Sequence, residues 1–330
     1  MKKWVIFLLV LPMVFIFAGP TPGSAQKIEL GIAGAGPASL AYTLAAGFAE
    51  NVNRRTNMVR LTPETTAGYV ENVRLLGRGD TQLGLSGGAN IYDGLHSKGP
   101  YKGEPPYKAI RGVAVAYVGT VSWNAKEGIN SIMDLVGKRV TLGPPGSNIA
   151  FLGEQILIAY GIKDKVGKLL RLSYAEGSRA FVDGEVDAFM GGPAPYPAVM
   201  QAGARKKINI LAVDLAHVKK IQKITPVIPE TIPAGVYKWL KKDVLAVGYV
   251  TYLAANEKVP AKAVYEILKV SLTPEGIKYL QNNHRLWSMW KTPMYIEEKG
   301  AFAVEGMKLH PGAAKYWKEK GAKIPASILP

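Results

Sequence analysis

The first residues along the chain that could do chemistry form a glycine-rich turn, Gly34 to Ser39, between an apolar strand and an alanine-rich helix. A turn of this kind holds the pyrophosphate of a dinucleotide at a helix N-terminus. Here Ser39 replaces the third glycine of that fingerprint. The fingerprint also requires an acidic residue about 20 positions after the turn, and Glu64 lies beyond that place. These two departures from the fingerprint argue against a flavin or nicotinamide cofactor. An exported oxidoreductase that uses such a cofactor is kept as the alternative function.

A second turn of the same kind, 143–148, reads GPPGSN and also enters a helix. Helix N-termini attract anions, because their free N–H groups and the helix dipole point outward. Two such ends predict a site that holds a carboxylate on backbone N–H groups without an arginine. The residues expected to contact it at the two turns are Ala35, Gly36, Ser39, Gly146, Ser147 and Asn148. A tight strand-to-helix connection without a ligand is the alternative at each turn.

The two turns belong to an internal repeat, in which a strand, a helix, a strand, a helix and a strand follow one another twice. The first copy covers 27–88 and the second 138–193. In the second copy we expect a strand at 168–177 and a helix at 178–187. Glycines at matching places are Gly36 and Gly146, Gly79 and Gly184, and the pairs 87–88 and 191–192. A chance similarity of two ordinary α/β units is the alternative.

Strands that alternate with helices in this way pair in parallel, with right-handed crossovers. The predicted fold class is therefore α/β, with two lobes that each hold a mainly parallel sheet flanked by helices. Two strands cross between the lobes, near 117–121 and 247–251, and such a molecule can close on a ligand by hinge motion. The expected boundaries are 1–25 for a signal peptide, 26–117 and 248–330 for lobe I, and 118–247 for lobe II.

Polar and aromatic side chains near the strand ends would line the cleft between the lobes, because open parallel sheets bind ligands there. A tyrosine can stack on the apolar part of a solute while its hydroxyl binds a polar group, and core packing is the alternative. Tyrosines that follow a strand end or a crossing are Tyr92, Tyr117, Tyr174 and Tyr196, of which Tyr117 and Tyr196 are assigned to the ligand. The other residues expected to bind it are Tyr42, Thr65, Thr66, Ser86, Asn90 and Pro195.

Composition argues against several kinds of chemistry. The 330 residues include no cysteine, so there are no disulfides and no thiolate metal site. The four histidines lack the spacing of metal ligands, and Ser147 lacks the flanking pattern of a catalytic nucleophile. We therefore expect no catalysis, no metal and no cofactor, and we expect His310 to cap a turn. The formal net charge of +16 comes from dispersed residues without a nucleic-acid motif, so it indicates an anionic ligand or a solvated surface and no nucleic-acid partner.

The N-terminal segment has the pattern of a secretory signal peptide. Lys2 and Lys3 precede an apolar run at 4–17, and small residues lead to a cleavage site after Ala25. The apolar run is short of the roughly 20 residues needed to span a bilayer, and an uncleaved anchor is the alternative. We therefore expect a soluble, monomeric protein in a periplasm.

Over nearly all of the mature chain, the sequence resembles the TAXI-type solute receptors of tripartite ATP-independent periplasmic (TRAP) transporters. The resemblance is carried by GAGPASLAYTLAAGFAE, ETTAGYVENVRLLGRGDTQLGL, GKRVTLGPPGSNI, LSYAEGSRAFVDGEVDAF, TIPAGVYKWLKKDVLAVG and HPGAAKYW. The pair Glu71 and Asn72 and the TIPAG segment at Thr231 are its more specific pieces. It implies a type II periplasmic binding protein fold and an integral-membrane, sodium-coupled TRAP permease as partner.

The resemblance also implies that the solute is a small carboxylate. This would be an amino acid or an organic acid, with a glutamate-like molecule as the first guess. A periplasmic receptor that reports ligand binding to a membrane signalling protein is an alternative in another functional class. Identification of the solute and the absence of bound flavin or nicotinamide would separate the receptor hypotheses from the oxidoreductase.

Overall fold

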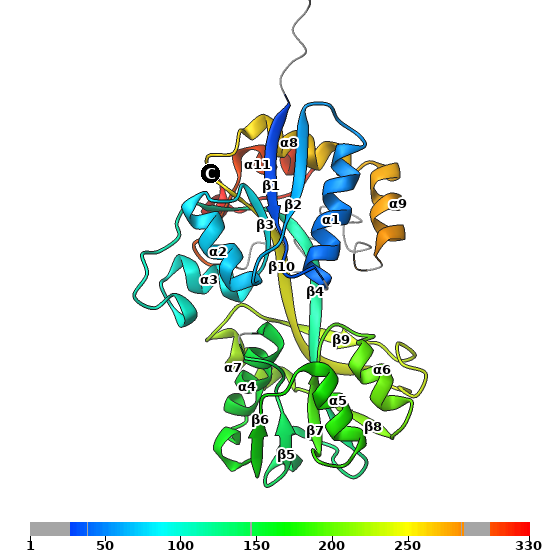
Figure 1. The fold of residues 1–330 in the computed structure, drawn as a ribbon. Helices are drawn as coiled ribbons and strands as arrows, with labels where there is room; N and C mark the ends of the chain where they lie inside the picture. The colour runs from blue at the N-terminus through cyan, green and yellow to red at the C-terminus, as the bar shows by residue number, and fades with distance from the viewer. Residues whose placement is uncertain (1–26, 38, 146, 285, 287–303) are drawn as a thin grey trace, which may run out of the picture.

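The structure, a computed structural model, describes residues 27–37, 39–145, 147–284, 286 and 304–330. Figure 1 shows two lobes, with two long strands that run from one lobe into the other. The signal peptide expected at 1–25 and the predicted ligand residue Gly146 lie outside the described residues. Within the described part of the chain, no helix is long and apolar enough to cross a membrane.

The first copy of the repeat forms the sheet of the upper lobe in Figure 1. Strand β1 (Ile28–Ala33) pairs in parallel with β2 (Val59–Glu64) and with β3 (Leu83–Gly87). Helix α1 (Leu40–Asn53) connects β1 to β2, and α2 (Tyr69–Arg78) connects β2 to β3. The predicted order of elements and their parallel pairing are confirmed for this copy.

The second copy repeats the arrangement in the lower lobe. Strand β5 (Arg139–Thr141) pairs in parallel with β6 (Lys168–Leu170) and with β7 (Ala188–Gly191). Helices α4 (Asn148–Ala159) and α5 (Tyr174–Val182) make the two connections. The strand orders β2-β1-β3 and β6-β5-β7 correspond, so the repeat in the sequence is also a repeat in space.

The start of α5 corrects the boundaries expected in the second copy. The strand expected at 168–177 ends at Leu170, and the helix expected from 178 begins at Tyr174. The cause is a capping box: the Ser173 hydroxyl accepts from the Glu176 N–H, and the Glu176 carboxylate accepts from the Ser173 N–H at 3.0 Å. This local bonding ends the strand and starts the helix four residues earlier than expected.

Matching glycines end the second helix of each copy. Gly79 caps α2 with a φ of 85°, and Gly184 follows α5 with a φ of 80°. Both values lie in the left-handed region, where a side chain is strained and glycine is not. The matched positions in the sequence therefore have the same backbone conformation.

Two long strands, β4 (Ile110–Lys126) and β10 (Val244–Asn256), run through both lobes (Figure 1). They pair with each other in antiparallel fashion, and Val247 lies opposite Val121 while Thr251 lies opposite Tyr117. The segments expected to cross between the lobes are thus partners in one ladder. The residue boundaries of the lobes stay a prediction.

The remaining elements extend and cover these sheets. The other strands are β8 (Ile208–Leu211), β9 (Ile228–Ile232) and β11 (Lys308–Leu309). The other helices are α3 (Gly88–Leu95), α6 (Pro197–Gly203), α7 (Leu215–Gln222), α8 (Ala261–Ser271), α9 (Pro274–Asn283) and α11 (Pro311–Glu319). Short 3-10 helices lie at Gly99–Tyr101, Ile132–Leu135, Lys163–Lys165 and Ala326–Ile328.

The C-terminal elements return to the first lobe, as β11 pairs in parallel with β4 next to Arg111 and Gly112. His310 is fully buried and caps α11, because its Nδ1 accepts from the Gly312 N–H at 3.2 Å. The expectation that His310 caps a turn is confirmed in the form of a helix cap. Burial lowers the pKa of His310, so its ring is neutral and can accept this bond.

Asn72 ties the carboxyl ends of β1 and β3 to the start of α2. Its side chain is fully buried, and its Nδ2 donates to the carbonyl oxygens of Gly34 at 2.7 Å and Leu85 at 2.8 Å. Its Oδ1 accepts from the Thr66 hydroxyl at 2.6 Å. One side chain therefore satisfies two buried carbonyls and fixes the loop from which α2 begins.

We predict that Asn72→Ala lowers the free energy of unfolding by about 3 kcal/mol, because it leaves two buried carbonyl groups without a donor. Urea denaturation measures this change. The control is Asn57→Ala, the same change at an exposed loop position before β2. The control should lose about 1 kcal/mol or less. Equal losses in the two variants would contradict the role given to Asn72.

Candidate functional site

A cavity of about 320 Å³ lies between the two lobes, and we call it the tyrosine cavity. Its wall comes from the ends of both repeats and from the two long strands. The lining residues are 39–41, 67–70, Asn90 and Tyr117 on the side of the first repeat, 147–149, Tyr174, Pro193 and Tyr196 on the side of the second, and Tyr249 of β10.

Four helices begin in the wall of the tyrosine cavity. The first residues of α1, α2, α4 and α5 all lie in its wall. Ser39 caps α1 by accepting from the Tyr42 N–H, and Ser147 caps α4 by accepting from the Ala150 N–H, each at 3.1 Å. The N–H groups of the first residues of a helix have no partner within the helix, and the dipole makes this end positive. The first turns of α2 and α5 each carry a glutamate, Glu71 and Glu176, whereas those of α1 and α4 carry no acidic residue. The starts of α1 and α4 therefore favour a negatively charged group most.

Three tyrosines of the first lobe and the long strands form a hydroxyl cluster in the wall. The Tyr69 and Tyr117 hydroxyl oxygens are 2.6 Å apart, and the Tyr117 ring meets the Tyr249 ring edge-on with centroids 6.3 Å apart. Gly119 leaves room for this arrangement, since a Cβ there would lie 2.4 Å from Tyr249 Cζ. Burial, followed by the neighbouring tyrosine, raises the pKa of both Tyr69 and Tyr249. These hydroxyls therefore stay neutral donors.

Tyr174 and Tyr196 contribute the opposite wall. The Tyr174 hydroxyl donates to Ser147 Oγ at 2.6 Å, and the Tyr174 and Tyr196 rings meet edge-on with centroids 5.6 Å apart. The Tyr196 N–H donates to the Tyr237 hydroxyl at 2.8 Å, which fixes the backbone beside the ring. Burial raises the pKa of Tyr174 to about 12, and it also raises that of Tyr196. Aromatic faces and neutral hydroxyls thus surround the space.

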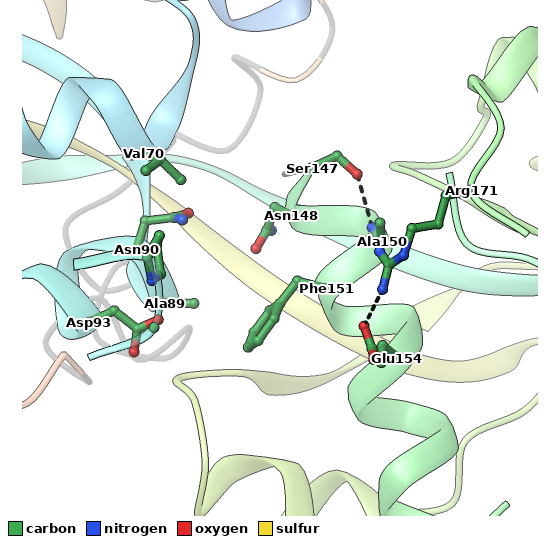
Figure 2. Close-up of a pocket in the computed structure, with 12 residues that line it drawn as sticks. Val70, Ala89, Asn90, Asp93, Ser147, Asn148, Ala150, Phe151, Glu154 and Arg171 are labelled. Atoms are coloured by element: carbon green, nitrogen blue, oxygen red, sulfur yellow. Dashed lines mark hydrogen bonds and ion pairs between the residues drawn. The ribbon is translucent and has the colours of Figure 1, made fainter. Parts of the chain in front are cut away.

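Two asparagines bring unpaired amide groups to the same place. Oδ1 of Asn90 and both Oδ1 and Nδ2 of Asn148 are buried and have no hydrogen-bond partner in the described part of the chain. Figure 2 shows the two side chains on opposite sides of the gap between the lobes. A Cβ at Gly87 would lie 3.0 Å from Asn90 Oδ1 and 4.0 Å from Asn148 Nδ2, so both amides lie over the same glycine. Buried polar atoms of this kind need a partner, which a ligand can supply.

A neighbouring cavity of about 280 Å³ shares Val70, Asn90, Ser147 and Asn148 with the tyrosine cavity (Figure 2). It carries the charged side chains Asp93, Glu154 and Arg171. Glu154 is neutralised, because its carboxylate forms ion pairs of 2.7 Å with both Lys163 and Arg171. In contrast, no charged side chain occurs among the described residues that line the tyrosine cavity.

The tyrosine cavity brings together some of the residues predicted from the sequence. Those in its lining are Ser39, Asn90, Tyr117, Ser147, Asn148 and Tyr196. Those outside its lining are Ala35, Gly36, Tyr42, Thr65, Thr66, Ser86 and Pro195. Thr66 and Ser86 instead support the start of α2, since Thr66 bonds to Asn72 and the Ser86 hydroxyl donates to the Tyr69 carbonyl at 3.2 Å. Whether any of these residues contacts a ligand stays a prediction.

Sequence reasoning missed Tyr69 and Tyr249 as residues of the cavity. Tyr69 could have been found from the repeat. It is the first residue of α2, and Tyr174, which was considered for the cleft, is the first residue of α5, the matching helix of the second repeat. Tyr249 could not have been found in this way, because a tyrosine within an apolar strand is expected to pack in the hydrophobic core. Tyr92, another tyrosine that follows a strand end, lies outside the tyrosine cavity. Its ring is tilted by 39° against that of His96, with the centroids 4.4 Å apart.

The arrangement is suited to binding. Ser147 Oγ has an N–H group and a tyrosine hydroxyl as its partners, and no histidine lines the cavity among the described residues. The described residues also contain no group of three or more histidine, aspartate or glutamate side chains that could hold a metal ion. What the cavity offers is positive helix ends, neutral hydrogen-bonding groups and aromatic surface.

The arrangement of the lobes and of the long strands identifies the fold. Two α/β lobes with a cavity between them and two long connecting strands make up the fold of the periplasmic solute-binding proteins. Within this fold, the chain belongs to the NMT1-like family, whose model matches residues 32–321.

The chain is similar to several solved structures at low sequence identity. The periplasmic sulfonate-binding protein SsuA from Methylobacillus flagellatus KT is 14% identical, with a TM-score of 0.52 over 90% of this chain and 96% of that chain. The periplasmic aliphatic sulphonate binding protein SsuA from Escherichia coli is 14% identical, with a TM-score of 0.45 over 92% and 96%. DctP7, a Bordetella pertussis extracytoplasmic solute receptor binding pyroglutamic acid, is 16% identical, with a TM-score of 0.43 over 89% and 92%.

We predict that Ser147→Ala and Tyr174→Phe are coupled in their effect on stability. Ser147→Ala removes a helix cap worth about 1 kcal/mol and a hydrogen bond of about 1 kcal/mol, so it should cost about 2 kcal/mol. Tyr174→Phe removes only the shared bond and should cost about 1 kcal/mol. The double variant should therefore cost about 2 kcal/mol in urea denaturation, because both changes remove the same bond.

The matched control is Ser39→Ala, which removes the corresponding cap of α1. No tyrosine hydroxyl is bonded to Ser39 in the described part of the chain, so combining this change with Tyr174→Phe should give the sum of the two losses. Additive losses for Ser147→Ala and Tyr174→Phe would show that the bond between them contributes nothing to stability.

Proposed function

We propose that the protein is an extracytoplasmic solute receptor that captures a small carboxylated solute in the tyrosine cavity. The observation that carries this proposal is the convergence of four helix N-termini on a cavity whose described lining has no charged side chain. A carboxylate at these helix ends would accept from backbone N–H groups and lie at the positive ends of the dipoles. The tyrosine faces would cover the rest of the molecule.

Capture of the solute would be accompanied by closure of the lobes. We propose lobe I as 26–117 with 248–330 and lobe II as 118–247, with the hinges in the crossing segments 117–121 and 247–251. The pairing of Val247 with Val121 and of Thr251 with Tyr117 supports this, because the two segments would bend as one ribbon. Ser39 and Asn90 on one side and Ser147 and Asn148 on the other would then enclose the ligand.

We propose that the receptor delivers its solute to an integral-membrane TRAP permease and acts in a periplasm without catalysing a reaction. The resemblance of the sequence to TAXI-type receptors supports this partner, and the N-terminal signal pattern supports export. A sodium gradient should then drive uptake of the solute into proteoliposomes that hold the permease. Uptake that depends on ATP and is indifferent to sodium would indicate an ABC permease instead.

We predict that small carboxylates stabilise the purified protein against heat. A solute at 100 times its dissociation constant adds about 2.7 kcal/mol to the free energy of unfolding if it binds only the folded state. A thermal-shift screen should compare each carboxylate with its primary amide and with the sulfonate of the same skeleton. The amide has the same shape without the charge, so it should give no shift.

Three other outcomes of the screen would contradict the proposal. Shifts only with sugars or cations would mean that the helix ends do not select an anion. Shifts only with sulfonates would mean that the solute is an anion of another class. A bound flavin or nicotinamide in the purified protein would favour the oxidoreductase.

A further inference from the structure

The groups that line the tyrosine cavity distinguish between kinds of carboxylic acid, and this inference rests on the proposed function. An amino acid carries an ammonium group on the carbon next to its carboxylate. If the carboxylate lies at the starts of α1, α2 and α4, the ammonium group must lie close to the same helix ends. A positive charge is disfavoured there, because the N-terminal end of a helix is itself positive.

An ammonium group in the tyrosine cavity would also need a partner of opposite charge. A buried charge without such a partner costs several kcal/mol, and proteins therefore pair buried ammonium groups with carboxylates. The described lining of the tyrosine cavity offers hydroxyls, amides and aromatic rings, and it offers no aspartate or glutamate. Glu71, in the first turn of α2, lies behind the wall, where its carboxylate accepts from the Ala67 N–H. Within the described lining itself, no carboxylate balances the charge of an amino acid.

The acidic side chains of the neighbouring cavity do not supply this balance. Glu154 already has two cations, Lys163 and Arg171, each at 2.7 Å. Asp93 is half-buried, and burial raises the pKa of its carboxyl group, with Lys98 as a nearby positive group. Each carboxylate thus has a positively charged neighbour of its own.

The unpaired amides of Asn90 and Asn148 suit a neutral group instead. Asn148 has both a donor, Nδ2, and an acceptor, Oδ1, that are buried without a partner, and Asn90 has an acceptor, Oδ1. A hydroxyl on the ligand can donate and accept, and an oxo group can accept from Nδ2. We propose that the cavity selects 2-hydroxy or 2-oxo acids over the amino acids with the same carbon skeleton.

Matched acids test this selection by isothermal titration calorimetry at neutral pH. Each set holds one skeleton and changes only the group on the second carbon: leucine, 2-hydroxy-4-methylpentanoate and 4-methyl-2-oxopentanoate; glutamate, 2-hydroxyglutarate and 2-oxoglutarate; phenylalanine, phenyllactate and phenylpyruvate. In any set with measurable binding, the hydroxy or oxo acid should bind more tightly than the amino acid by about tenfold or more.

The outcomes separate this inference from the proposed function. An amino acid that binds as tightly as its hydroxy and oxo counterparts would overturn the inference and leave carboxylate capture intact. Failure of every acid in the three sets and in the thermal-shift screen would contradict carboxylate capture itself, and the inference with it.

Asn148→Asp tests the electrostatic reason by placing a carboxylate in the wall. The variant should bind the preferred hydroxy or oxo acid about tenfold or more weakly than the unchanged protein does, while its affinity for the amino acid should fall less. The ratio of the affinity for the hydroxy or oxo acid to the affinity for the amino acid should therefore become smaller. The control is Asn57→Asp, the same change at an exposed loop position before β2, which should leave both affinities unchanged. Circular dichroism checks folding, and Asn90→Asp replaces the variant if Asn148→Asp does not fold. A folded variant with an unchanged ratio would overturn the inference.

Discussion

The parallel pairing of strands within each repeat is the constraint on which the site depends. A parallel strand must be followed by a crossover helix, so the helix begins at the carboxyl end of the strand. Because β1 and β2 are parallel, α1 and α2 begin at the same edge of the first sheet, and α4 and α5 begin at the matching edge of the second. Two such edges that face each other put the positive ends of helices on both sides of one cavity. The charge preference of the tyrosine cavity is therefore a result of topology and requires no charged side chain.

The long strands β4 and β10 connect the edges of the two sheets and complete the wall of the cavity between them. Both strands pass through both lobes, and they carry Tyr117 and Tyr249 into the wall between them. The hydroxyl cluster with Tyr69 thus connects the first lobe to the ladder that joins the lobes. A solute that contacts Tyr117 on one side and Asn148 on the other would couple its binding to the relative position of the lobes. In the first lobe, Asn72 keeps the start of α2 in place by its bonds to Gly34, Leu85 and Thr66.

Much of this fold could be predicted from the sequence, and the site less so. The glycine turns and the repeat predicted β-α-β-α-β units because those patterns are local, and both copies have this order of elements. The predicted start of α5 was wrong, because the prediction did not take the capping box of Ser173 and Glu176 into account. Ser39 and Ser147 could be found as helix caps, but Tyr249 could not be found as a cavity residue. Its position depends on Gly119 of another strand, which is a long-range contact that no local pattern contains.

A crystal structure of the protein with its tightest-binding organic acid tests the central claim most directly, because it locates the carboxylate. The account predicts that the carboxylate oxygens accept from backbone N–H groups at the first residues of α1, α2 or α4, at ordinary hydrogen-bond distances of about 2.7–3.2 Å. The rest of the molecule should then lie against Tyr117, Tyr174 and Tyr196. A carboxylate bound instead to Arg171 in the neighbouring cavity, with the helix ends left to water, would contradict the claim that topology creates the anion site.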